Sequence, residues 1–139
     1  MIKQVLLIDD DVVGCFLISS MIKEINPDIE IIIANDGNEA VNLLLESQDI
    51  LNLSNKSNLP DLILLDIHMP VMDGLEFLDV IFKLDIVNNN NIPIYLLTNS
   101  DHHKDFEKAS NYNIEGYIAK PITNEILETI LNKYEKVNK

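Results

Sequence analysis

The chain has little positive charge and little cysteine. Ten Lys and Arg stand against 23 Asp and Glu among 139 residues, which gives a formal net charge of −13. A surplus of this size makes nucleic acids and anionic membranes poor partners. Cys15 is the single cysteine, so no internal disulfide can form. Its apolar neighbours favour a small core residue over a reactive thiol.

Long hydrophobic runs are also missing. No apolar stretch approaches the length needed to span a membrane, and the N-terminus enters a strand-like run without a charged leader. We therefore expect a soluble cytoplasmic protein. With 47% hydrophobic residues, residues 1–139 should form one domain with a core over about 3–136. No linker to a second domain is visible.

Apolar runs of strand length alternate with segments of helical period. The strands are expected at 3–8, 29–34, 61–65, 93–98 and 115–119. The first helical segment carries apolar residues at helical spacing, namely Val12, Val13, Phe16, Leu17, Met21 and Ile25. Further helices are expected around Ala40–Leu44, Leu75–Leu84, Phe106–Ala109 and Ile126–Tyr134. The first of these follows an N-cap at Asp36 with Glu39 three positions on. Strand followed by helix, repeated five times, predicts a doubly wound α/β fold with a parallel sheet covered on both faces.

Two segments are rich in Ser and Asn. Residues 49–60 and the four-Asn tract at 88–91 are expected to be exposed, mobile connections.

Acidic residues follow two of the expected strands directly. Residues 5–8 run into Asp9, Asp10 and Asp11, and residues 62–65 run into Asp66. Each acid alone has a simpler explanation as a helix cap or a turn residue. Since the carboxyl ends of parallel strands share one edge, Asp9, Asp10 and Asp66 are expected to converge there. Two carboxylates about 4 Å apart repel by on the order of 4 kcal/mol at an effective dielectric near 20.

Two further strand ends supply groups that relieve this repulsion. Lys120 follows the last strand and precedes Pro121, and Thr98 ends the fourth strand with a hydroxyl. Three carboxylates and one ammonium leave a charge of about −2, which a divalent cation neutralises. Oxygen ligands with few protein donors suit Mg²⁺.

These residues in this order resemble the response-regulator receiver domain of two-component signalling. The resemblance covers about residues 3–136 and rests on Asp9-Asp10, Asp66 with Met69-Pro70 and Asp73-Gly74, Thr98, and Tyr117 with Lys120-Pro121. It implies a flavodoxin-like sheet of order 2-1-3-4-5, which the spacing alone does not choose.

The resemblance also implies a role for each residue. Asp66 is expected to accept a phosphoryl group from a histidine kinase or a phosphotransfer protein. Asp10, Asp66 and the main-chain carbonyl of His68 are expected to hold Mg²⁺ directly, with Asp9 acting through water. Lys120 would pair with the phosphoryl oxygens, Thr98 would bond to one of them, and Tyr117 would change rotamer. The switched protein-binding surface would lie on residues 101–136, and the protein would be a monomer or a phosphorylation-dependent dimer.

Some positions depart from the family pattern. Asn99 stands where a small residue is common, and His68 lies two positions after Asp66, so both are expected to influence the lifetime of the phosphorylated form. The connection at 49–60 is about ten residues longer than in compact receivers. His102 and His103 lack partners at metal-ligand spacing and are expected to be solvated.

Three functions are compatible with these residues. The leading one is a phosphoacceptor switch with self-catalysed transfer and dephosphorylation, rather than a metabolic enzyme. A pseudo-receiver that binds partners without phosphorylation is the second, favoured only by Asn99. The third is a haloacid-dehalogenase-type phosphohydrolase, because Asp9 and Asp11 form a D-x-D pattern. Against it, Val12-Val13 stands where that family has Gly-Thr or Gly-Val, and no late acidic pair lies near the last strand.

Overall fold

The computed structural model describes residues 1–47, 59–85, 91–99 and 103–136. Its strands are β1 (Gln4–Ile8), β2 (Glu30–Ala34), β3 (Leu62–Asp66), β4 (Ile94–Thr98) and β5 (Gly116–Ala119). Its helices are α1 (Val12–Ile25), α2 (Gly37–Ser47), α3 (Gly74–Lys83), α5 (His103–Ala109) and α6 (Asn124–Lys136). Most of the two predicted connections at 49–60 and 88–91 lies outside the described residues.

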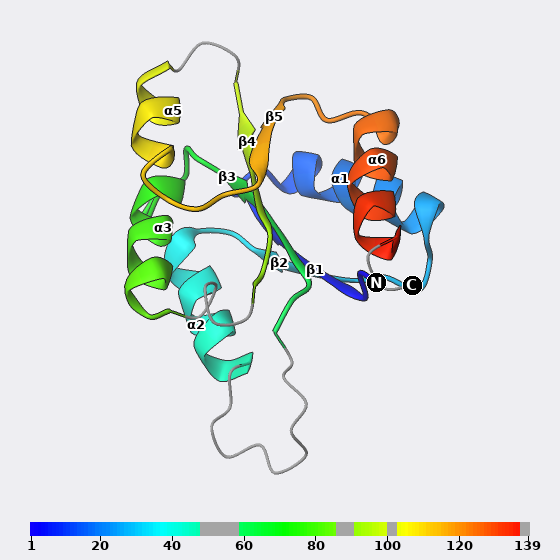
Figure 1. The fold of residues 1–139 in the computed structure, drawn as a ribbon, viewed down its shortest axis with the longest axis horizontal. Helices are drawn as coiled ribbons and strands as arrows, with labels where there is room; N and C mark the ends of the chain where they lie inside the picture. The colour runs from blue at the N-terminus through cyan, green and yellow to red at the C-terminus, as the bar shows by residue number, and fades with distance from the viewer. Residues whose placement is uncertain (48–58, 86–90, 100–102, 137–139) are drawn as a thin grey trace.

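The five strands form one parallel sheet in the order β2-β1-β3-β4-β5. In Figure 1, helices α2, α3 and α5 cover one face of the sheet, and α1 and α6 cover the other. The doubly wound α/β fold and its strand order, both predicted from the sequence and the resemblance, are therefore confirmed. All five strands begin one residue later than predicted from the apolar runs, and β3 extends to Asp66 itself.

Each face of the sheet carries its own apolar core. On one face, Phe77 and Ile81 of α3 pack with Leu44 of α2 against the sheet. On the other, Ile22 of α1 and Leu127 of α6 are fully buried. Strands buried on both sides need apolar residues at every position, which explains their unbroken hydrophobic runs.

Four of the six apolar residues singled out in α1 lie outside its buried face, while Met21 and Ile25 are partly buried against the core. Cys15, Ile18 and Ile22 face the core, as predicted for Cys15, whereas Phe16 is 69% exposed. The exposed set comprises Val12, Val13, Phe16 and Leu17. Hydrophobic periodicity predicted the wrong buried face for α1 because both sides of this helix are apolar. Spacing alone therefore could not distinguish the side that packs on the sheet from the exposed side.

Local capping fixes where two helices begin. Asp36 accepts a hydrogen bond from the Glu39 amide at 2.8 Å, so the predicted N-cap of α2 is confirmed. Asp73 and Glu76 form a reciprocal capping box at the start of α3. By contrast, Asp11 precedes α1 without a side-chain cap hydrogen bond. Helix capping through the side chain therefore does not explain this acid.

Candidate functional site

Asp66 is the last residue of β3 and is 6% exposed. The loop after it is held close by Gly74, whose amide donates to the Ile67 carbonyl at 2.8 Å. A Cβ built on Gly74 would lie 2.6 Å from the carbonyl oxygen of Asp66. Only glycine fits at this distance, so Gly74 allows the β3–α3 loop to pack directly against the strand end.

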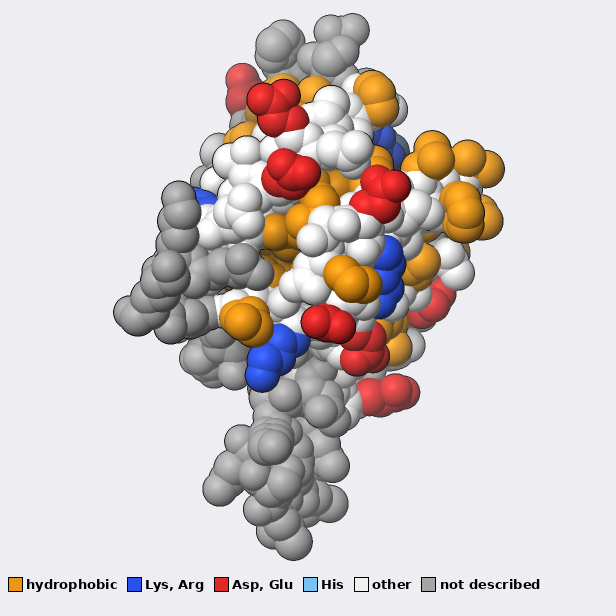
Figure 2. Space-filling model, turned by 90° about the vertical axis from the view of Figure 1, so that its right-hand side faces the viewer, with side chains coloured by type: hydrophobic (Ala, Val, Ile, Leu, Met, Phe, Trp, Pro, Cys, Tyr) orange, Lys and Arg blue, Asp and Glu red, His pale blue; other side chains and the backbone are white. Residues whose placement is uncertain are grey.

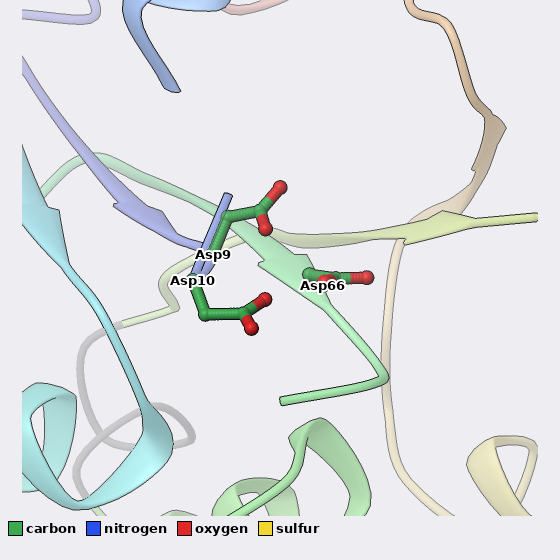
Figure 3. Close-up of side chains that lie close together, drawn as sticks. All are labelled: Asp9, Asp10 and Asp66. Carbon is green, nitrogen blue, oxygen red and sulfur yellow. The ribbon is translucent and has the colours of Figure 1, made fainter. Parts of the chain in front are cut away.

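Asp9 and Asp10 follow β1, the strand that pairs with β3. Asp9 is 1% exposed, and one of its carboxylate oxygens, Oδ1, accepts a hydrogen bond from the Asp11 amide at 3.0 Å. Asp10 is exposed. One carboxylate oxygen from each of Asp9, Asp10 and Asp66 lies within 4.8 Å of the others, and Figure 3 shows the three side chains close together at the strand ends.

Lys120 lies directly after β5 and reaches this cluster. Its Nζ donates to the second oxygen of Asp9, Oδ2, at 3.0 Å and is 3.3 Å from Oδ1 of Asp66. Its backbone amide donates to the Thr98 carbonyl at 2.8 Å, which ties the end of β5 to the end of β4. One ammonium thus bridges two buried carboxylates that come from different strands.

The cluster holds more negative charge than this ammonium neutralises. Burial and the neighbouring Asp9 raise the pKa of Asp66 from 3.8 to about 6, although Lys120 acts in the opposite direction. Burial alone would lower the pKa of Lys120, but Asp9 and Asp66 outweigh it and raise that pKa. Lys120 is therefore held charged, while Asp66 remains short of a positive partner.

Thr98 and Tyr117 occupy the neighbouring strands. Thr98 is buried at the end of β4, one residue beyond the Leu97 that lies opposite Asp66. Tyr117 of β5 is 43% exposed and turned toward α5. Its ring meets that of Phe106 edge-on at 4.9 Å, and its hydroxyl donates to the Phe106 carbonyl at 3.4 Å.

His68 and Asn99 are exposed residues outside the group of three carboxylates. The His68 side chain is exposed and is not part of the carboxylate group. The expectation that its main-chain carbonyl binds a metal stays a prediction. His102 lies outside the described residues, and His103 begins α5. Asn99 is exposed beside Lys120.

Sequence reasoning missed a hollow beside the acids. A cavity of about 410 Å³ opens between α1 and the segment after β5, and its lining includes Asp9 and Lys120 at one end and Val13, Leu17 and Ile122 elsewhere. Figure 2, which looks onto the side of the molecule formed by α1 and α6, shows hydrophobic side chains gathered at its right-hand edge. The signal in the sequence was the excess of apolar residues in α1 over what one buried face requires.

The fold and the acid cluster together define a flavodoxin-like α/β domain with a carboxylate–lysine site at the carboxyl ends of its strands. The model of the response regulator receiver domain matches residues 5–132, and the chain belongs to this family of two-component signalling. The resemblance inferred from the sequence is therefore confirmed.

Individual relatives agree with this assignment. The chain is 32% identical over 130 residues, 94% of its length, to hybrid signal transduction histidine kinase I of Dictyostelium discoideum, of which it covers 7%. A two-component response regulator from Cytophaga hutchinsonii matches with a TM-score of 0.80 and 31% identity, covering 99% of this chain and 98% of that one.

A third similar structure contains a metal. The receiver domain of sensor histidine kinase PA1611 from Pseudomonas aeruginosa, with a magnesium ion coordinated in its active-site cleft, matches with a TM-score of 0.75 and 25% identity. The match covers 96% of this chain and 97% of that one.

The chain spans between 7% and 42% of the length of three curated relatives that it matches. In the part of the chain that the structure describes, no helix combines the length and the apolar character needed to cross a membrane.

Proposed function

We propose that Asp66 accepts a phosphoryl group and that the phosphorylated domain signals through a protein-binding surface. The observation that carries this proposal is the position of Asp66, a nearly buried carboxylate 3.3 Å from the Lys120 ammonium and grouped with two further acids. Carboxylates at such a spacing are costly to keep charged unless they bind a cation or a transferred group.

The donor set fits Mg²⁺. Asp10 and Asp66 would hold the ion directly, together with the main-chain carbonyl of His68. Both oxygens of Asp9 are already hydrogen-bonded, one to the Asp11 amide and one to Lys120, which supports a role for Asp9 through water. When bound, Mg²⁺ supplies the positive charge that brings a phosphate dianion into this acidic site.

Phosphoryl transfer needs orientation and charge neutralisation more than covalent assistance. An oxygen of Asp66 attacks phosphorus in line with the leaving group, so an O–P bond forms as the donor's P–N bond breaks. Lys120, whose Nζ is 3.3 Å from Asp66, would pair with the phosphoryl oxygens, and the Thr98 hydroxyl would bond to one of them after transfer. Because the pKa of Asp66 is about 6, most of its carboxyl groups are ionised and nucleophilic at pH 7.

A change at Thr98 would reach the surface through Tyr117. The ring of Tyr117 packs on Phe106 of α5, so its inward rotation would release a contact between β5 and α5. The switched surface would accordingly lie on residues 101–136, which include α5, β5 and α6. Receiver domains are typically signalling modules rather than metabolic enzymes, and we propose the same for this one.

The donor would be a histidine kinase or a phosphotransfer protein that docks over α1. The exposed apolar residues Val13 and Leu17 line the hollow that has Asp9 and Lys120 at one end. A protein seated there places its phosphohistidine beside Asp66. We further propose that residues 1–139 act as one receiver domain and that it works in the cytoplasm.

Intact-mass spectrometry during incubation with acetyl phosphate and Mg²⁺ tests the proposed function. We expect one added phosphoryl group, absent in Asp66→Asn and absent with a chelator, whereas Asp28→Asn should gain it like the wild type because Asp28 is an exposed turn residue. If the wild type gains no phosphoryl group and also fails to bind beryllofluoride with Mg²⁺, the domain is not a phosphoacceptor.

A further inference from the structure

The two edges of the sheet are protected very differently. β5 has four residues, starts with Gly116 and is followed by Lys120 and Pro121. Short strands, charges and prolines are the usual means by which an edge avoids pairing with another chain. β2, at the opposite edge, carries three consecutive isoleucines with neither a proline nor a lysine within it.

Alternate residues of β2 direct their backbone groups away from the sheet. The Glu30 amide donates to the Lys3 carbonyl at 2.8 Å, and the Ala34 carbonyl accepts from the Asp9 amide at 3.0 Å. In a parallel ladder the residues between these, Ile31 and Ile33, point their N–H and C=O groups outward. Within the described residues, these outward groups have no hydrogen-bond partner.

The isoleucine side chains at the β2 edge lie beside exposed apolar residues of α1. Ile31 packs on the core under α1, so Ile33, two residues on, lies on the same side of the sheet, and it is 38% exposed. Both isoleucines line a hollow of about 450 Å³ together with Phe16 of α1. An unpaired strand edge therefore meets an exposed aromatic ring on the neighbouring helix.

We infer that this edge pairs with the β2 edge of a second copy of the chain, the two strands running antiparallel about a two-fold axis at Ile32. In that register Ile31 of each copy lies opposite Ile33 of the other, and the outward N–H and C=O groups of these residues bond to one another. Ile32 then faces its own counterpart, and the two sheets become one.

The sequence of β2 favours a second copy because the strand is complementary to itself. The register at Ile32 places isoleucine opposite isoleucine and Glu30 opposite Ala34, so no like charges meet within the strand. Moving the axis to Ile33 would set Glu30 against Asp36, and moving it by half a residue would leave the outward groups without partners.

Charge and position define how this dimer behaves. Each copy carries a net charge of −13, so the dimer should be weak at low salt and tighter when the charges are screened.

β2 lies at the edge opposite β5, on which the proposed switch residue Tyr117 lies. Association should therefore be the same with and without beryllofluoride, unlike a dimer made by α5, β5 and α6.

Sedimentation equilibrium of the full chain, from about 10 to about 500 µM in about 50 mM and about 500 mM NaCl, tests the dimer. We expect reversible association that is tighter at high salt. Ile33→Lys should weaken it at least about tenfold, because the ammonium would be desolvated at the strand edge. Ile126→Lys is the matched control, since Ile126 has the same 38% exposure but lies on α6.

Disulfide trapping provides a second readout that does not depend on Ile33. The two Ile32 positions face each other across the axis at about 4.5 Å between Cα atoms, a distance that a disulfide spans. Ile32→Cys should form a covalent dimer on mild oxidation, while Glu30→Cys should not. A wild type that stays monomeric at both salts, equal weakening by Ile126→Lys, or trapping through Glu30→Cys alone would each overturn the inference.

Discussion

At the scale of single residues, the site is a problem of charge. Asp9 and Asp66 are nearly buried, and Lys120 is the one cation within ion-pair distance of them among the described residues. The raised pKa of Asp66 follows from burial and from Asp9, and it means that the carboxylate form of Asp66 is held at a cost in free energy. A bound Mg²⁺ ion or a phosphoryl group with Mg²⁺ would remove this cost.

Asp66→Asn should stabilise the protein at neutral pH. Between about pH 4 and pH 6 the folded state keeps a proton on Asp66 that the unfolded state has lost, so the free energy of unfolding of the wild type falls as the pH rises through this window. In Mg²⁺-free buffer at pH 7, we expect the free energy of unfolding of the asparagine variant to exceed that of the wild type by about 2 kcal/mol. Near pH 4 the two free energies of unfolding should be equal. Urea denaturation at the two pH values measures both differences.

The exposed Asp28→Asn provides the control for a general loss of negative charge and should change little at either pH. A variant Asp66→Asn that is less stable than the wild type at pH 7 would mean that Asp66 is well compensated in the folded protein.

At the scale of elements, α1 has two apolar faces, one that packs on the sheet and one that is exposed beside the acids. Cys15, Ile18 and Ile22 pack on the sheet, whereas Val13 and Leu17 border the hollow beside the acids. An apolar residue on the first face contributes to folding, while one on the second face is free to contribute to binding.

Truncation to alanine on each face separates these contributions. Ile22→Ala should lower the free energy of unfolding by about 3 kcal/mol, because Ile22 is fully buried and its loss leaves a cavity. Leu17→Ala, at a half-exposed site, should cost no more than about 0.5 kcal/mol. Equal losses in urea denaturation would show that α1 packs differently from this description.

A second prediction at this scale concerns the contact between β5 and α5. Phe106→Leu removes the ring that holds Tyr117 outward, a contact of about 1 kcal/mol. If outward Tyr117 marks the unphosphorylated state, beryllofluoride with Mg²⁺ should bind up to about fivefold more tightly to the variant. Titration of the bound form by ¹⁹F NMR gives the affinity.

Phe82→Leu provides the matched control, since the ring of Phe82 in α3 packs on Tyr112 rather than on Tyr117. Unchanged affinity in Phe106→Leu, or the same gain in both variants, would contradict a role for Phe106 in holding Tyr117.

At the scale of the whole molecule, sequence patterns predicted the doubly wound fold because buried parallel strands must be apolar throughout. The strand order came from the resemblance alone, since spacing does not order strands. The meeting of Asp9, Asp10 and Asp66 followed from their places at strand ends. Two features could not be predicted from the sequence. One is the buried face of α1, because that helix is apolar on both sides, and the other is the hollow beside Lys120, which depends on tertiary packing.

The central claim is that Asp66, among the acids at this edge of the sheet, is the residue that carries the phosphoryl group. Borohydride reduces an aspartyl phosphate to homoserine, so tandem mass spectrometry after incubation with acetyl phosphate, Mg²⁺ and then borohydride locates the modified residue. The account predicts homoserine at position 66 and at none of Asp9, Asp10, Asp11 or Asp73. Homoserine at one of those positions instead would contradict it.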